Sequence, residues 1–86
     1  MSLKQQLKKV RNLIAKGWCR DNWHKKIRGK DHYCIMGARN QVDKNRCNVL
    51  YSKINEIFDG CAIGFNDECK DKRVILRRLD KAIKEL

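Results

Sequence analysis

The sequence predicts an all-α fold: a compact four-helix domain, residues 1–86, with a structured segment at residues 18–30 that interrupts the helices. Apolar residues recur every three or four positions in four separate stretches, as on the buried face of an amphipathic helix. There is no proline and the five glycines stand singly, so no flexible linker divides the chain. A domain of 86 residues buries only roughly 60 to 65% of its unfolded surface, which predicts a modest core.

The first helix is expected to begin after Ser2. Ser2 and Gln5 have the spacing of a capping box, in which each side chain accepts a hydrogen bond from the backbone of the other residue. Gly17 is placed to end this helix in a left-handed conformation. Its apolar residues at helical spacing are Leu3, Leu7, Val10 and Ile14. Its outward cations are Lys4, Lys8, Lys9, Arg11 and Lys16. Such a face is either solvated or anion-binding, and a membrane-surface helix is disfavoured because no aromatic residue lies on the apolar side.

Residues 18–30, the basic segment, interleave aromatic rings with cations and show neither a helical nor a strand period. This composition suits phosphate contact combined with the stacking of a base on an aromatic ring. The alternative is that Trp18 and Trp23 fill the core of a small domain. Gly29 indicates a tight turn, and a short hairpin in the segment is compatible with that turn.

A second helix is expected from about Asp31 or His32 to Val42, with Asp31 available as its N-cap. Gly37 lowers the helix propensity there, which indicates close approach of another helix or backbone room for a ligand. A turn at residues 43–45 precedes the third helix. The apolar stripe of that third helix is Cys47, Leu50, Tyr51, Ile54, Ile57 and Phe58.

Gly60 is expected to end the third helix, and the final helix is expected from about Lys70 to Leu86. Its candidate caps are Asn66, Asp67 and Asp71. Its inner face carries Ile75, Leu79, Ala82, Ile83 and Leu86. Acids partly neutralise its outer cations, so the first helix is the better candidate for a binding surface. The predicted core is Trp18, Cys34, Leu50, Ile54, Phe58, Ile75 and Leu79.

The net charge of +11 is concentrated near the N-terminus. Residues 1–30 hold ten Lys or Arg and one acid, giving +9, whereas residues 31–86 carry only +2. This asymmetry favours an anionic partner, namely nucleic acid, a nucleotide or an acidic protein surface. The predicted anion-binding residues are Lys8, Arg11, Lys16, Arg20, Trp23, Lys25, Lys26 and Arg28.

The five cysteines include no Cys-x-x-Cys pair, which fits a reduced compartment and thiols that pack as small apolar residues. No apolar run could span a membrane or serve as a signal peptide, so a cytoplasmic protein is expected. Cys34 with His32 or His24 could form a thiol and base, but no third orienting group is recognisable, so no enzyme is predicted. No cofactor motif is present. A weak candidate set of zinc ligands, whose spacing matches no common finger, is Cys19, His24, His32 and Cys34.

Several short motifs are spread over nearly the whole chain. They are Gly17-Trp18, Cys34-x-x-Gly37-Ala38, Phe65-Asn66-Asp67, and a closing Val74 with Leu79-Asp80-x-Ala82-Ile83. In their order and spacing they resemble a family of small uncharacterised domains from bacteriophages and actinobacteria. The resemblance implies a phage or bacterial cytosolic origin and a shared pocket region. The residues of that region would be Trp18, Cys34, Asn66 and Asp67. The basic segment departs from the family by being shorter and far more basic.

The sequence therefore predicts a non-catalytic binding module that engages nucleic acid chiefly through phosphates, with weak sequence specificity. The alternative, which follows from the resemblance, is a phage-encoded anti-defence inhibitor that binds a host protein or sequesters a nucleotide signal. A nucleotide would suit a basic pocket near Arg20, Trp23, Arg28 and Asn66, with stacking on the indole and cations on the phosphate.

Overall fold

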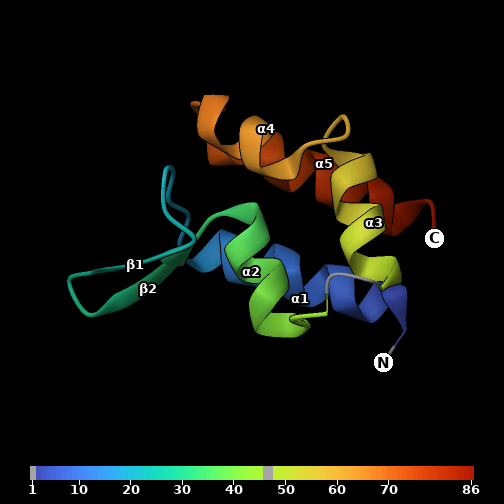
Figure 1. Ribbon diagram of the computed structural model, residues 1–86, viewed down its shortest axis with the longest axis horizontal. Coiled ribbons are helices and arrows are strands. Elements are labelled where there is room, and N and C mark those ends of the chain that lie inside the picture. The colour runs from blue at the N-terminus through green and yellow to red at the C-terminus, as the bar shows by residue number, and fades with distance from the viewer. Residues whose placement is uncertain (1, 46–47) are drawn as a thin grey trace.

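The computed structural model describes residues 2–45 and 48–86. These residues form a compact, predominantly helical domain, as predicted, from which a two-stranded hairpin projects (Figure 1). The elements are α1 (Leu3–Lys16), β1 (His24–Ile27), β2 (Lys30–Tyr33), α2 (Ile35–Val42), α3 (Val49–Ile57), α4 (Ala62–Glu68) and α5 (Lys72–Lys84). The four predicted helices are α1, α2, α3 and α5. The further helix α4 has only seven residues, too few to show a clear apolar period.

Helix α1 lies at the centre of the packing and contacts α2, α3, α5 and β2. Its buried Leu7, Val10 and Ile14 belong to one cluster with apolar side chains from the other helices. The predicted core residues that are at most 4% exposed are Cys34, Leu50, Ile54, Phe58, Ile75 and Leu79. Trp18 is half-buried and packs against the edge of this cluster. No helix of the described residues is long and apolar enough to cross a membrane.

The two ends of α1 differ in how well the sequence predicts them. The capping box is confirmed, because Ser2 Oγ accepts from Gln5 N at 3.2 Å and Gln5 Oε1 accepts from Ser2 N at 3.0 Å. The left-handed cap at Gly17 is wrong, since its backbone is extended with a φ of −174°. Gly17 instead lies against β2: its carbonyl accepts from Tyr33 N at 2.9 Å, and any Cβ would collide with the Asp31 carbonyl oxygen.

The predicted start of α2 at Asp31 or His32 is also wrong. Those residues belong to β2, where Asp31 is paired with Lys26 and His32 with Lys25. Helix α2 begins at Ile35 and its N-cap is Cys34, whose Sγ accepts from Gly37 N at 3.2 Å. The backbone of residues 31–33 is thus committed to strand pairing, which overrides the local signal for a capping aspartate.

The hairpin begins inside the basic segment and continues past it to Tyr33. Its two-residue turn is Arg28-Gly29, and both residues have positive φ, 52° and 78°, as a type I′ turn requires. Gly29 was correctly predicted to mark a tight turn. Arg28 lacks the conformational freedom of glycine, so its left-handed backbone costs about 1 kcal/mol.

The later helix boundaries lie close to those predicted from the sequence. Gly60, with a φ of 92°, lies in the turn that follows α3, and Asp71 caps α5 by accepting from Arg73 N at 2.9 Å. Asn66 and Asp67 lie inside α4 and do not cap α5. Cys47, predicted to begin the stripe of the third helix, lies outside the described residues. Helix α3 begins at Val49, with Asn48 as its N-cap.

A buried arginine holds the turn between α2 and α3. Arg39 is fully buried, and its Nη1 donates to the carbonyl oxygens of Asp43 at 2.9 Å and Asn45 at 3.3 Å. Its guanidinium also lies over the Tyr51 ring, 5.0 Å from the centroid. Arg39 was not among the predicted core residues. Its position four residues after the buried Ile35 places it on the inner face of the helix.

Gly37 lets the basic segment cross α2 in backbone contact. A Cβ on Gly37 would overlap the Trp23 carbonyl oxygen, which also accepts from Cys34 N at 3.3 Å. The predicted close approach therefore comes from the basic segment and not from another helix. We expect Gly37→Ala to lower the free energy of unfolding by about 2 kcal/mol or more, despite its better helix propensity, because backbone must move. Urea denaturation measures this loss.

Gly64→Ala provides the matched control for that substitution. Gly64 is also helical, but its Cβ would meet only the Cys61 side chain, whose Sγ lies at 3.3 Å and can shift slightly. Its free energy of unfolding should change by less than about 1 kcal/mol. Equal losses in the two variants would contradict a specific backbone contact at Gly37.

Candidate nucleic-acid interface

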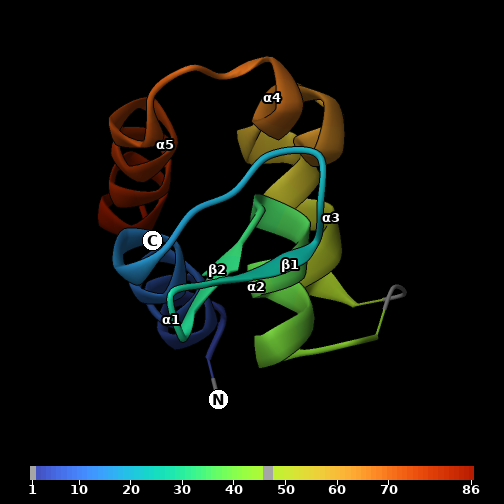
Figure 2. The same cartoon turned by 90° about the vertical axis from the view of Figure 1, so that its left-hand side faces the viewer.

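The hairpin is the most exposed element of the fold. Residues 24–31 are all exposed, and only His32 and Tyr33, where β2 joins the body, are partly covered. Figure 1 shows the hairpin projecting beyond the helices, and Figure 2 shows it from its own side, crossing in front of α1 and α2. The hairpin surface consists of Lys25, Lys26, Arg28 and Lys30. The sequence predicted the first three of these cations as binding residues and left out Lys30.

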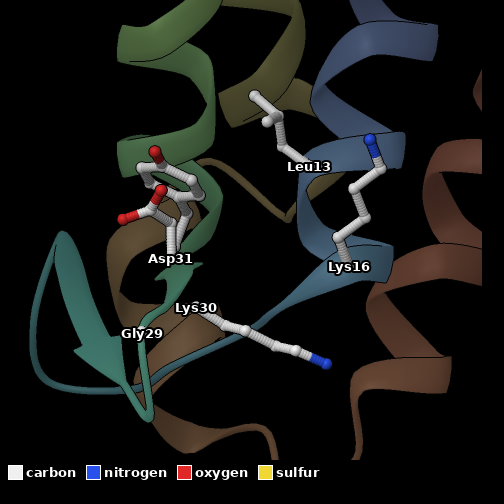
Figure 3. A pocket seen from close by; sticks show the side chains of 6 residues that line it. Leu13, Lys16, Gly29, Lys30 and Asp31 are labelled. Carbon is white, nitrogen blue, oxygen red and sulfur yellow. The ribbon is translucent and has the colours of Figure 1, made fainter.

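A shallow open groove separates one side of the hairpin, from its turn at Gly29 to Tyr33, from α1 (Figure 3). It has a volume of about 460 Å³ and is lined by Leu13, Lys16, Gly29, Lys30, Asp31 and Tyr33. Leu13 and Lys16 come from α1, whereas Lys30 and Asp31 come from the hairpin. The groove thus places the predicted Lys16 close to the hairpin surface.

A second hollow continues along α1 from the first and shares Leu13 and Lys16 with it. It is lined by Lys9, Asn12, Leu13, Lys16, Gln41 and Val42. Lys9 therefore joins Lys16 on the side of α1 that faces the hairpin and α2, although it was not among the predicted binding residues. Its helical spacing is a signal that could have included it, because Lys9 and Lys16 are seven residues apart and share one face.

Other predicted cations are engaged elsewhere. Arg11 Nε donates to Asp80 Oδ1 at 3.0 Å, across to α5. Arg20 Nη1 donates to the Cys69 carbonyl oxygen at 3.3 Å, after α4. Lys8 is exposed on α1 but lines neither hollow. The predicted set is therefore divided, and Lys16 is the predicted cation of α1 that lines the groove beside the hairpin.

The one acid of the hairpin has a partner within the hairpin. Asp31 Oδ1 bonds His24 Nε2 at 2.8 Å, and the imidazole stacks on the Tyr33 ring with centroids 5.0 Å apart. This hydrogen bond from His24 holds the pKa of the Asp31 carboxyl below its usual range. The carboxylate is thus ionised at neutral pH, and His24 and Tyr33 fix its position beside the hairpin cations.

The structure does not gather the weak zinc set. His24 pairs across the hairpin with Tyr33, and His32 with Lys25, so strand alternation places the two imidazoles on opposite faces. Cys34 Sγ caps α2, and Cys19 Sγ donates to carbonyl oxygens at 3.3 and 3.5 Å. Among residues 2–45 and 48–86, no three His, Cys, Asp or Glu side chains are grouped to hold a metal ion.

The two buried thiols are poor nucleophiles in this setting. Burial raises the pKa of both Cys19 and Cys34, and for Cys19 the nearby Cys34 raises it further. Both therefore stay protonated at neutral pH, whereas a catalytic cysteine needs a lowered pKa.

Two residues of the predicted pocket region, Trp18 and Asn66, are joined by a hydrogen bond. Asn66 is fully buried, and its Oδ1 accepts from Trp18 Nε1 at 2.7 Å and from Ile35 N at 3.0 Å. Its Nδ2 donates to the Cys19 carbonyl oxygen at 3.1 Å. Asp67 Oδ1 accepts from Asp21 N at 3.0 Å. These contacts join α4, the start of the basic segment and the first turn of α2, so their role in this structure is to hold the fold.

The proposed nucleotide pocket does not form from the predicted residues. Asn66 is enclosed by its partners, whereas Arg28 lies at the hairpin turn and Trp23 is 41% exposed at the start of the hairpin. Arg20 points to the end of α4. The four residues therefore do not line one cavity, and only Trp23 remains an exposed ring close to the hairpin cations.

Comparisons with protein-family models, with curated proteins and with solved structures found no match for this chain. The resemblance to small phage and actinobacterial domains therefore stays a prediction from the motifs.

Proposed function

We propose that this protein is a non-catalytic nucleic-acid-binding module that contacts phosphates through the hairpin surface, assisted by Lys16 and Lys9 of α1. The observation that carries the proposal is the concentration of four exposed cations on a projecting hairpin whose one acid is held by His24. Cations presented in this way neutralise phosphates without a large cost of desolvation, because they remain in water.

Two further observations support this function. None of the four cations of the hairpin surface has a carboxylate partner among the ion pairs of the described residues, in contrast to Arg11, Arg73 and Arg78. Trp23, at the base of the hairpin, offers an exposed ring on which an unpaired base could stack.

The test is the salt dependence of binding to a labelled 20-base-pair duplex, followed by fluorescence anisotropy. If four to six cations touch phosphates, the slope of log K against log salt should be roughly −4 to −5 on duplex and smaller in magnitude on a single strand. An affinity that does not depend on salt, or no binding at low salt, would contradict the proposal.

A pull-down from bacterial lysate separates the inhibitor alternative from this function. Nuclease treatment should release the bound material if nucleic acid is the ligand. Recovery of one stoichiometric host protein that survives nuclease would favour the inhibitor, for which the hairpin cations would meet an acidic protein surface.

A further inference from the structure

We infer that the tip of the hairpin enters the major groove of B-form duplex DNA, with Arg28 directed to the groove floor. This inference rests on the proposed function and names its ligand. Residues 24–31 of the hairpin are all exposed, and only Tyr33, where β2 joins the body, packs against the core, so the rest of the hairpin is not required to complete the core. A two-stranded hairpin that packs against little else is only marginally stable by itself. Because this hairpin adds little to the core, we assign it a role at the protein surface.

The turn gives a second reason. Asn-Gly or Asp-Gly would adopt the type I′ turn with less strain, yet this chain places an arginine there, at a φ of 52°. That position is the point of the hairpin farthest from its junction with the body. Beside it, Ile27 is 42% exposed, so an apolar side chain and a guanidinium lie together at the tip. A guanidinium can donate two hydrogen bonds to a guanine edge, and an apolar side chain can contact a thymine methyl group.

The dimensions of the hairpin select one kind of groove. Paired strands lie about 4.8 Å apart, and a sheet with its side chains is about 10 Å thick. The major groove of B-form DNA, about 12 Å wide and 8.5 Å deep, admits such a ribbon, whereas the minor groove is about 6 Å wide. The major groove of an RNA duplex is too narrow for side chains to read. The fit therefore favours duplex DNA.

The alternation of the strand supplies contacts to both walls of that groove. Lys25 and Lys26 are consecutive in β1, so their side chains leave opposite faces of the hairpin. With the tip inserted, one lysine meets the phosphates of each strand. Lys16 lies across the protein's own groove from Lys30 (Figure 3), beside the hairpin, and meets a flanking phosphate.

The experiment compares the full-length protein on three labelled ligands of one sequence at matched salt: duplex DNA, duplex RNA and single-stranded DNA. Duplex DNA should bind about tenfold or more tightly than the other two. Methyl green, which occupies the major groove, should compete, and netropsin, which occupies the minor groove, should not. Equal affinity for the three ligands, a single-strand preference, or competition by netropsin alone would overturn the inference.

Two variants that each remove one charge sharpen the test. Arg28→Asn retains a residue suited to the type I′ turn, so the hairpin persists; it should weaken DNA binding about fivefold or more and reduce the preference over RNA. Lys26→Gln should weaken binding to all three ligands alike and lower the salt slope by about one. Unchanged preference in Arg28→Asn would overturn the groove assignment. If the unaltered protein showed no salt-dependent binding to any of the three nucleic acids, that result would instead contradict the proposed function itself.

Discussion

Reversing three charges on the hairpin, with Lys25, Lys26 and Arg28 all changed to glutamate, should lower the affinity for duplex DNA by about 10²-fold or more at moderate salt. The reversal removes three phosphate contacts and adds three repulsions at the same place. The fold should persist, because all three side chains are exposed and exposed charges contribute little to stability. Anisotropy measures the affinity, and circular dichroism with urea denaturation measures the fold.

A control variant carries the same change of charge on another face. Arg77, Lys81 and Lys84 are exposed on α5, and changing all three to glutamate also lowers the net charge from +11 to +5. Its affinity should fall far less, because those residues lie on a different element from the hairpin. Equal losses in the two variants would show that binding follows net charge and not the hairpin surface.

Replacement of Asn66 by alanine should cause a large loss of stability, because the side chain is fully buried. It leaves Trp18 Nε1, Ile35 N and the Cys19 carbonyl oxygen without the partner they share. Each buried polar group left unsatisfied costs about 1–3 kcal/mol, so we expect the free energy of unfolding to fall by about 3 kcal/mol or more. That is a large fraction of the stability of a domain of this size. Urea denaturation followed by tryptophan fluorescence measures the loss.

Asn12→Ala is the matched control for the substitution at Asn66. Asn12 is exposed on α1, and the same truncation there should change the free energy of unfolding by less than about 0.5 kcal/mol. A loss below about 1 kcal/mol at Asn66 would mean that water can replace its amide, and the network would then not hold the fold.

The sequence predicted best what depends on near neighbours. The capping box at Ser2, the stripe around Leu50 and Ile54, the turn at Gly29 and the cap at Asp71 are each set by residues a few positions apart. The start of α2 was mispredicted because Asp31 looks like a cap locally, while its actual partner, Lys26, lies across a turn. A strand is predicted from alternating apolar and polar residues, and this segment has no clear alternation, so its strand pairing was not predicted.

The candidate site depended on more distant partners. Nothing close to Arg11 indicates that Asp80, 69 residues away, pairs with it, or that Arg20 reaches the end of α4. The role of Asn66 was partly foreseen, since it was grouped with Trp18. A pocket was expected there from the resemblance to small phage and actinobacterial domains, whereas in the structure Trp18 and Asn66 form a hydrogen bond with each other. Only the packed fold decides between those outcomes.

Because residues 24–31 supply nothing to the core, the hairpin and the helical body are under separate constraints. The body fixes the base of the hairpin through Gly17, Trp23 and Tyr33, and packing in the core does not constrain the side chains beyond that base. Strands could be lengthened in steps of two residues, which preserves the face on which each side chain lies. Related chains could thus change ligand by exchanging a few exposed residues, and the same body could serve as a scaffold for hairpins grafted from elsewhere.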